Sequence, residues 1–200
     1  ENGEIIIITE EGIQSIKPFK KVKERPCIFE RIYFASPDSI VDNKTVYTYR
    51  KRLGEQLANE NNICADVVVP IPDSGVSAAI GFSQRSSIPF ELGIIRSHYV
   101  GRTFIEPSQT IRQFGVKLKH SVNRSCIENK KVILIDDSIV RGTTASKIVK
   151  MVYEAGAKEV HLGISCPPIR YPDFYGIDTP SSEELIASKC SLEEMTKLVG

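Results

Sequence analysis

One stretch decides the fold: Val132-Ile133-Leu134-Ile135-Asp136-Asp137-Ser138-Ile139-Val140-Arg141-Gly142-Thr143-Thr144. It reads as an apolar strand that ends in two adjacent carboxylates and is followed at once by a polar loop with one glycine. Apolar residues then recur with helical spacing from Ala145 to Val152. Because open α/β sheets bind ligands beyond the carboxyl ends of their strands, this order predicts a ligand site at Asp136 to Thr144.

Two kinds of chemical group meet in this stretch. The N-terminus of a helix presents free backbone N–H groups and the positive end of the helix dipole, which suit a phosphate. Paired carboxylates suit sugar hydroxyls or a divalent metal. A phosphorylated sugar satisfies both demands. An Asp-Asp pair and a Gly-Thr-Thr start are also ordinary turn and helix-capping chemistry, but the complete pattern is more specific, and it lacks the Gly-Lys-Ser/Thr of a Walker loop.

A second turn of the same kind follows the strand expected at residues 66–69. Its sequence is Pro70-Ile71-Pro72-Asp73-Ser74-Gly75, so a strand again passes into a helix through a hydroxyl and a glycine. Gly75 allows a ligand to approach the backbone closely. Two phosphate-binding turns on one parallel sheet suit a ligand phosphorylated at both ends, such as phosphoribosyl pyrophosphate (PRPP). The alternative is a pair of unrelated capped helices.

Composition and charge place the chain among globular proteins. Its 200 residues are 41% hydrophobic and 26% charged, which fits one domain with a real core and a small appendage. A net charge of +1 gives no general attraction to nucleic acid or to an anionic membrane, and neither a long apolar span nor a signal peptide is visible. The cysteines lack a CxxC pair, which predicts neither a disulfide framework nor a zinc site and makes a reduced, cytoplasmic setting the default. They are Cys27, Cys64, Cys126, Cys166 and Cys190.

Strand-like and helical patterns alternate along the chain, which predicts an α/β fold with a mostly parallel sheet flanked by helices. Strands are expected at residues 5–9, 13–16, 27–35, 66–69, 92–95, 131–135 and 160–164. Helices are expected at residues 45–60, 74–84 and 143–155. Capping boxes at Ser181-x-x-Glu184 and Ser191-x-x-Glu194 are expected to open two short terminal helices.

Residues 97–120 fit this alternation least. They contain glycines, a proline and several cations. A loop of this length inside a compact domain is usually functional or mobile. The pattern predicts a lid, with glycines as hinges and cations for a pyrophosphate, that keeps water away from an activated sugar. The alternative is a disordered basic excursion.

Six runs spread over nearly the whole chain resemble the glutamine PRPP amidotransferases (amidophosphoribosyltransferases). They are residues 27–39, 70–74, 99–105, 135–144, 175–178 and 184–187. The runs that begin at Tyr99 and at Asp136 are the most specific. The resemblance implies a type I phosphoribosyltransferase fold with a small hood. It also implies the first committed step of purine biosynthesis, in which PRPP and ammonia, normally derived from glutamine, form phosphoribosylamine and pyrophosphate.

The resemblance further implies roles for single residues. Asp136 and Asp137 would face the ribose hydroxyls and Mg²⁺, with Ser74 as a further Mg²⁺ position. Tyr99 and Arg102 of the lid would join the two aspartates as catalytic residues. The turn at Asp73 would flank the pyrophosphate, and the loop that starts at Ser138 would hold the 5′-phosphate. The residues expected to bind PRPP are Asp73, Ser74, Gly75, Arg96, Asp136, Asp137, Ser138, Ile139, Val140, Arg141, Gly142, Thr143 and Thr144. Arg96 stands where the family commonly has lysine, so the pyrophosphate or nucleotide contacts at that point are expected to differ.

Members of this family join the phosphoribosyltransferase domain to an N-terminal glutaminase domain. Residues 1–26 are predicted to be the last part of such a domain and a linker. Residues 27–200 are predicted to be the phosphoribosyltransferase domain, truncated at its C-terminus. The N-terminal nucleophilic cysteine of a glutaminase is absent, because residue 1 is glutamate. This chain is therefore expected to use free ammonia and not glutamine.

Some members of the family also carry an iron–sulfur cluster. Cys27 stands at one ligand position, but Asp173 replaces the cysteine of a second. No cluster is therefore expected, and Cys27 is predicted to be a buried strand residue. The resemblance implies a homo-oligomer, either dimer or tetramer, and inhibition by purine nucleotides, with neither nucleic acid nor a membrane as a partner.

The sequence leaves two other functions open. A nucleobase salvage phosphoribosyltransferase would share the PRPP motif but would need a pocket that stacks and reads a base. A regulatory module that binds PRPP without reacting would share it too. Such a module would be expected to carry a basic, DNA-binding appendage, and none is visible.

Overall fold

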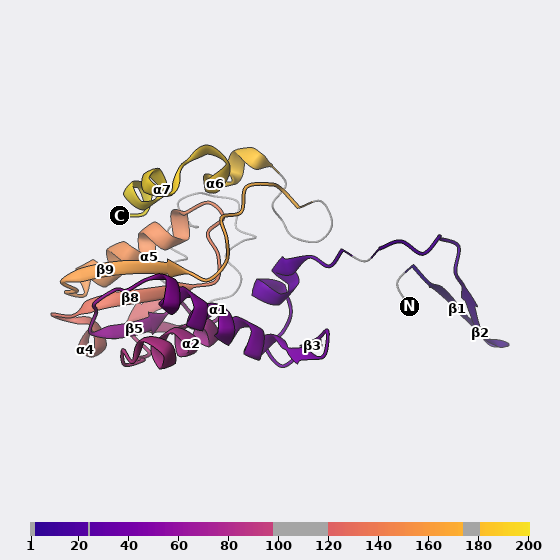
Figure 1. The fold of residues 1–200 in the computed structure, drawn as a ribbon, viewed down its shortest axis with the longest axis horizontal. Coiled ribbons are helices and arrows are strands. Elements are labelled where there is room, and N and C mark those ends of the chain that lie inside the picture. Colours follow the sequence, from indigo (N-terminus) through magenta and orange to yellow (C-terminus); the bar gives the residue numbers. More distant parts are fainter. Residues whose placement is uncertain (1–2, 24, 98–119, 174–180) are drawn as a thin grey trace.

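Three parallel strands form the centre of the molecule. The computed structural model describes residues 3–23, 25–97, 120–173 and 181–200 (Figure 1). Its central sheet has the order β5-β8-β9, and both pairings are parallel. The strands are β5 (Val67–Pro70), β8 (Lys131–Asp136) and β9 (Glu159–Ile164). Every residue of β5 and the four central residues of β8 are buried, as expected for strands covered on both faces. The predicted parallel sheet is confirmed.

Helices cover both faces of this sheet, and the alternation of side chains along the strands decides which face each residue meets. Val69 and Leu134 point into a core that they share with Ile148 of α5 (Thr143–Glu154). Val68 and Ile133 point the opposite way, toward α2 (Val76–Ser86). The helix α1 (Val46–Glu60) packs against α2, as Figure 1 shows below the sheet. The predicted helices at 45–60, 74–84 and 143–155 are confirmed to within two residues at each end.

Smaller elements lie around the sheet. Two short antiparallel pairs are β3 (Ile40–Val41) with β4 (Lys44–Thr45), and β6 (Ile94–Arg96) with β7 (His120–Val122). The short helix α4 (Arg124–Ile127) precedes β8. The C-terminal elements are η3 (Ser182–Glu184), α6 (Ile186–Lys189) and α7 (Leu192–Val199), and α7 packs on α5. Sequence patterns predicted neither β7 nor α4, which are only three and four residues long.

The strand predicted at Cys27–Ala35 is wrong. Residues 28–29 are helical, and a π-helical turn, η1 (Glu30–Phe34), follows. The run is rich in aromatic and β-branched residues, which favours a strand prediction, but only Ile32 is buried within it. A half-buried strand of this length would bury alternate positions, and this run does not. Cys27 is exposed, so its prediction as a buried strand residue is also wrong.

One of the two predicted capping boxes forms. Ser191 accepts a hydrogen bond from the backbone N–H of Glu194, whose carboxylate accepts one from the N–H of Ser191, and α7 begins there. At Ser181 only a 3₁₀ turn forms, and the Ser181 hydroxyl accepts from the N–H of Glu183. The side chain of Glu184 forms an ion pair with Arg141 instead.

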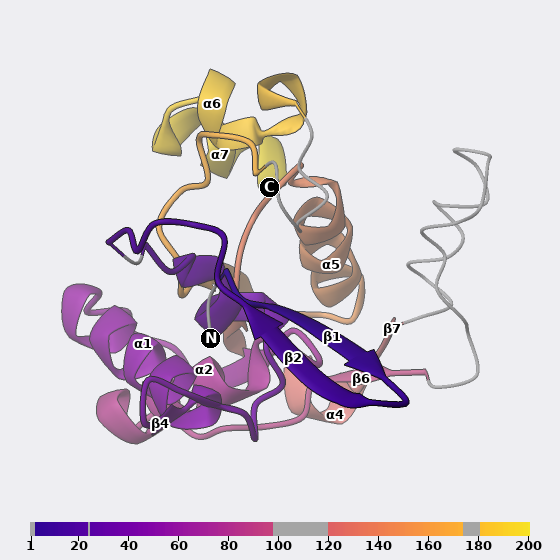
Figure 2. The same ribbon diagram turned by 90° about the vertical axis from the view of Figure 1, so that its right-hand side faces the viewer.

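A separate hairpin precedes these elements. β1 (Ile5–Thr9) and β2 (Gly12–Ile16) pair antiparallel, and every residue of both strands is exposed. Figure 1 places the hairpin away from the central sheet, and in Figure 2, turned by 90°, it lies in front of the other elements. The strands predicted at residues 5–9 and 13–16 are confirmed to within one residue. Among the described residues, no helix combines the length and the apolar character needed to cross a membrane.

Candidate active site

Two neighbouring strands bring both predicted turns to one edge of the sheet. Because β5 and β8 run parallel, Asp73–Gly75 and Asp136–Thr144 follow carboxyl ends that lie side by side. The backbone N–H of Ile71 donates a hydrogen bond of 2.8 Å to the carbonyl of Ile135. A Cβ on Gly75 would lie only 2.2 Å from that same carbonyl oxygen, so only glycine allows this turn to pack on β8.

Asp136 ends β8 half-buried, and Asp137 directly after it is buried. Asp137 is 4% exposed, and its Oδ1 accepts a hydrogen bond of 2.8 Å from Ser138 Oγ. Its Oδ2 is buried and has no hydrogen-bond partner within the described ranges. Burial raises the pKa of Asp137, although the hydroxyls of Ser138 and Ser74 and the charge of Arg50 act in the opposite direction. Burial and the charge of Asp137 raise the pKa of Asp136 to about 7, against a hydrogen bond from the Asp137 N–H.

This pair fits ligands that supply positive charge or donate hydrogen bonds. A buried carboxylate oxygen without a partner is costly unless a cation or a donor reaches it. Sugar hydroxyls and Mg²⁺ both do so, and the hydroxyl of Ser74 lies beside Asp137 as a further oxygen. No group of three His, Cys, Asp or Glu side chains in the described part of the chain is arranged to hold a metal. A divalent ion here would therefore take most of its oxygen ligands from substrate and water.

Arg50 brings a buried cation from α1 toward the carboxylates. Its side chain is 5% exposed, and it donates hydrogen bonds to two backbone carbonyls, from Nε to Arg31 over 2.9 Å and from Nη2 to Ala35 over 2.8 Å. Burial lowers the pKa of Arg50, and the charge of Asp137 opposes this effect. Sequence reasoning missed Arg50. The available signal was its place four residues after Val46 and four before Gly54, on the buried face of the helix.

Cys166 follows β9 and is hydrogen-bonded to the backbone beside the carboxylates. Its backbone N–H donates a hydrogen bond of 3.0 Å to the carbonyl of Asp137, just as Ser165 donates to Asp136. Burial, followed by the charges of Asp137 and Asp136, raises the pKa of the Cys166 thiol to about 12. The thiol is therefore neutral at physiological pH, and it donates a hydrogen bond of 3.0 Å to the carbonyl of Pro167.

The predicted phosphate loop leads directly into α5. Gly142 has a φ of +75°, in the left-handed region that favours glycine, and it offers no side-chain cap to the helix. Thr143 and Thr144, the first two helical residues, are exposed. The N-terminus of this twelve-residue helix thus presents backbone N–H groups and hydroxyls, which suit a phosphate.

Two of the predicted PRPP-binding cations are paired within the protein. Arg96 of β6 forms an ion pair with Asp73. Arg141 forms an ion pair with Glu184, in which Nε lies 2.7 Å from Oε2. Sequence reasoning gave Glu184 no role at the site, because the two partners lie 43 residues apart in the chain.

Other predicted residues lie outside the described part of the chain. These are Tyr99 and Arg102 of the lid, together with the run at 175–178. Their roles stay predictions. Asp173 is described, but the absence of an iron–sulfur cluster stays a prediction as well.

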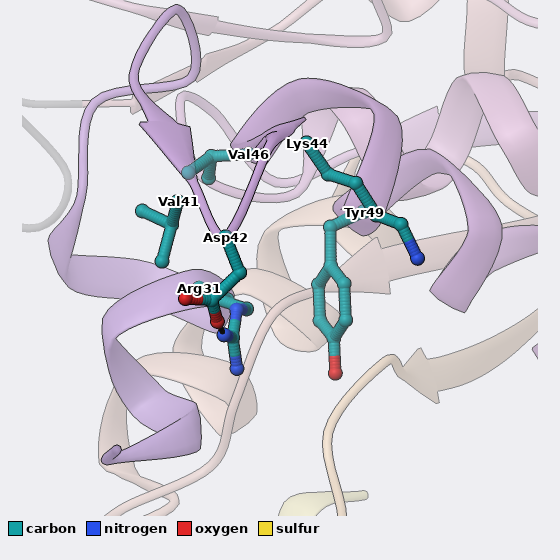
Figure 3. Close-up of a pocket in the computed structure, with 6 residues that line it drawn as sticks. All are labelled: Arg31, Val41, Asp42, Lys44, Val46 and Tyr49. Atoms are coloured by element: carbon teal, nitrogen blue, oxygen red, sulfur yellow. Dashed lines mark ion pairs between the residues drawn. The ribbon is translucent and has the colours of Figure 1, made fainter. Parts of the chain in front are cut away.

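A hollow of about 210 Å³ lies beside η1 and the start of α1 (Figure 3). Its lining residues are Arg31, Val41, Asp42, Lys44, Val46 and Tyr49, none of which the sequence placed at a site. Arg31 pairs with Asp42 across it and lies 5.9 Å from the centre of the Tyr49 ring. The carbonyl of Arg31 also accepts a hydrogen bond from Arg50. The hollow therefore lies on the outer side of the contact between η1 and α1.

Comparison with known proteins identifies the family. A sequence model described as phosphoribosyl transferase domain matches residues 36–190. The chain belongs to the phosphoribosyl transferase domain family. This match covers α1, the sheet and both turns of the site, so the phosphoribosyltransferase fold predicted from the sequence is confirmed.

Several relatives are similar to the chain over its whole length, which confirms the predicted resemblance. The amidophosphoribosyltransferase of Rhizobium etli is 59% identical over an alignment of 206 positions, which covers 100% of this chain and 42% of the relative. A chloroplastic amidophosphoribosyltransferase of Glycine max is 56% identical and covers 99% of this chain and 35% of the relative. A solved structure, glutamine PRPP amidotransferase from B. subtilis complexed with ADP and GMP, is 52% identical with a TM-score of 0.86. It covers 99% of this phosphoribosyltransferase chain and 44% of its own. The chain thus spans less than half the length of these relatives.

Proposed function

We propose that this chain is the PRPP-binding part of an amidophosphoribosyltransferase, which forms 5-phosphoribosylamine from PRPP and ammonia and releases pyrophosphate. The observation that carries the proposal is the meeting of two turns at one sheet edge. The carboxylates of Asp136 and Asp137 lie there between Ser74 on one side and the open N-terminus of α5 on the other. A ligand with a phosphate at one end, a diol in the middle and a pyrophosphate at the other end matches this order. The high identity to amidophosphoribosyltransferases favours ammonia as the acceptor.

Each part of the site has a task in this proposal. In the reaction, the nitrogen of ammonia bonds to C1 of the ribose while the bond from C1 to the pyrophosphate oxygen breaks. The ring gains positive charge on the way, and carboxylates beneath the ribose hydroxyls favour that charge. Mg²⁺, held by Asp136, Asp137 and Ser74 together with substrate oxygens, would neutralise charge on the leaving pyrophosphate. Residues Ser138 to Thr144 would bind the 5′-phosphate, and Asp73 to Gly75, with Arg96, would flank the pyrophosphate.

The proposal includes the rest of the assembly. Residues 1–26 would belong with a glutaminase domain that supplies ammonia, and the lid with Tyr99 and Arg102 would close over PRPP. We place the enzyme in the cytoplasm as a homo-oligomer, with purine nucleotides as inhibitors. The B. subtilis relative, solved with ADP and GMP, supports the last point.

Pyrophosphate release from PRPP with Mg²⁺ tests this function directly. Ammonium chloride, glutamine and free nucleobases are compared as acceptors. Release that depends on ammonium chloride, and not on a nucleobase, is expected. A response to a nucleobase would move the protein to salvage. Binding without release under any condition would favour a PRPP-binding regulatory module.

Replacing the carboxylates tests the site itself. Asp136→Asn and Asp137→Asn are each expected to lower phosphoribosyl transfer by at least about a hundredfold, because each removes charge that favours the cationic ring. The far-ultraviolet circular dichroism spectrum should stay that of the wild type. Wild-type rates in both variants would contradict the assigned roles.

A further inference from the structure

The C-terminal segment Glu184–Ala187 holds the predicted phosphate loop by three different contacts. The guanidinium of Arg141 is fixed by Glu184, since both Nε and Nη2 donate to the same carboxylate oxygen, Oε2. The backbone N–H of Ile186 donates a hydrogen bond of 2.9 Å to the carbonyl of Val140. A Cβ on Gly142 would lie 3.0 Å from Ile186 Cδ1, so the side chain of Ile186 closes the space at that glycine.

The base of this segment is anchored in the core. Leu185 is fully buried, and Ala187 is buried as well. The helix that follows, α7, packs on α5, with Val199 in the same core cluster as Val149. Residues Val140 to Gly142 are therefore held between α5 and a rigid segment, and Glu184 is the one charged side chain that this segment directs at the loop in the described structure.

We infer that Glu184 is a positioning residue for the 5′-phosphate loop: by pairing with Arg141 it keeps residues Val140–Gly142 in the shape that accepts a phosphate. This inference rests on the proposed function, because it names a further residue of that same site.

The ion pair matters for the loop rather than for the stability of the fold. Both side chains are well exposed to solvent, at 39% for Arg141 and 44% for Glu184, and exposed pairs contribute little to folding free energy. The pair does set the direction of a long, flexible side chain that stands beside an anion site. While it is paired, the charge of Arg141 is balanced, and the phosphate is left to the backbone N–H groups and hydroxyls at the start of α5.

Two effects compete when Glu184 loses its charge. The freed guanidinium gains access to the phosphate, which strengthens binding, but at this exposure water and salt screen most of that attraction. The loop loses the contact that orders it, which weakens several charge-assisted hydrogen bonds to the phosphate together. The second effect is the larger one, so we expect weaker binding of the 5′-phosphate.

The test measures ligand binding by calorimetry in the full-length protein carrying Glu184→Gln. The probes are PRPP, ribose 5-phosphate and pyrophosphate, each with Mg²⁺. The dissociation constants of PRPP and ribose 5-phosphate are expected to rise about tenfold, while that of pyrophosphate stays unchanged. In steady-state kinetics the KM for PRPP should rise by the same factor, with kcat unchanged. Glu183→Gln is the matched control. It removes the same charge from an exposed side chain one residue before Glu184, and it should leave every constant at its wild-type value.

Two further variants separate positioning from general damage. Glu184→Asp keeps the charge and should recover part of the lost affinity. The exchanged pair Arg141→Glu with Glu184→Arg should recover more than Arg141→Glu alone. Wild-type or tighter binding of ribose 5-phosphate by Glu184→Gln would overturn the inference, and so would an equal loss for pyrophosphate. A wild-type protein that binds none of the three probes would overturn the proposed function, and this inference with it.

Discussion

The half-buried Asp136 and the buried Asp137 are neighbours at the end of β8, and this gives the free energy of unfolding a definite pH dependence. Burial and the charge of Asp137 raise the pKa of Asp136 from its ordinary 3.8 to about 7, and burial raises that of Asp137 too. Between these values the folded state holds a proton that the unfolded chain releases. The free energy of unfolding should therefore fall as the pH rises from about 4 to 7, by at most roughly 4 kcal/mol.

Urea unfolding at several pH values, without divalent cations, measures this dependence. Asp136→Asn removes the titrating group and should flatten most of the curve between pH 4 and 7. Glu10→Gln, which changes an exposed carboxylate on the hairpin, should leave the curve as it is in the wild type. A wild-type protein whose stability rises with pH over this interval would show that the pair is not held as a desolvated carboxyl pair.

At the same scale, the sequence predicted the residues whose chemistry is local. Asp136, Asp137 and Ser74 stand at the ends of recognisable strands, so their place at the sheet edge followed from the pattern and is where the structure has them. Arg50 and Glu184 were not predicted, since their partners lie 15 to 43 residues away along the chain. Nothing in a single sequence says which carbonyl or guanidinium a buried cation or a surface carboxylate will meet.

At the scale of elements, α1 and α2 pack so closely that their backbones touch. A Cβ on Gly54 would lie 1.8 Å from the carbonyl oxygen of Ala78, and one on Gly81 would lie 1.9 Å from that of Lys51. Alanine normally stabilises a helix relative to glycine by about 1 kcal/mol. Here Gly54→Ala is expected to do the opposite and lower the free energy of unfolding by about 2–4 kcal/mol, because the helices must move apart.

Thermal or urea unfolding of the purified variants checks this change of sign. Gln56→Ala is the control, since it lies on the exposed side of the same helix and should change stability by less than about 0.5 kcal/mol. A Gly54→Ala protein as stable as the wild type would mean that the two helices do not touch at this point.

Helices and strands were predicted correctly where one hydrophobic period dominated the sequence. The prediction failed where two signals conflicted. The predicted strands at 66–69 and 131–135 contain unbroken apolar runs from Val67 and from Val132, and the one at 160–164 alternates apolar residues with His161 and Gly163. All three form. The run from Cys27 to Ala35 has the composition of a strand but one buried position, at Ile32, and it folds as helical turns. At Ser181 the capping box fails because Glu184 turns to Arg141 instead of to the backbone. Tertiary contacts decided both cases.

At the scale of the whole molecule, the boundary expected between residues 26 and 27 stays a prediction, which the packing on its two sides makes testable. The hairpin of β1 and β2 exposes all of its residues, including Ile8 at 74%, and its strands pack mainly against each other. By contrast, η1 packs on α1, buries Ile32, and offers to Arg50 the carbonyl oxygens of Arg31 and Ala35. We therefore expect residues 1–26 to lie outside the folded unit and residues 27–36 to be part of it.

Two truncations on either side of this boundary test it. Removal of residues 1–26 should leave the midpoint of thermal unfolding within about 2 °C of the original, and it should improve solubility by removing exposed isoleucines. Removal of residues 1–36 should lower the free energy of unfolding by about 3–5 kcal/mol, because it uncovers the core beneath Ile32 and leaves the buried charge of Arg50 without both of its carbonyl partners. Equal stability of the two truncated chains would contradict the role of Arg50 as the residue that joins η1 to α1. A large loss on removing only residues 1–26 would mean instead that the hairpin packs on the domain, and the boundary would then lie before residue 5.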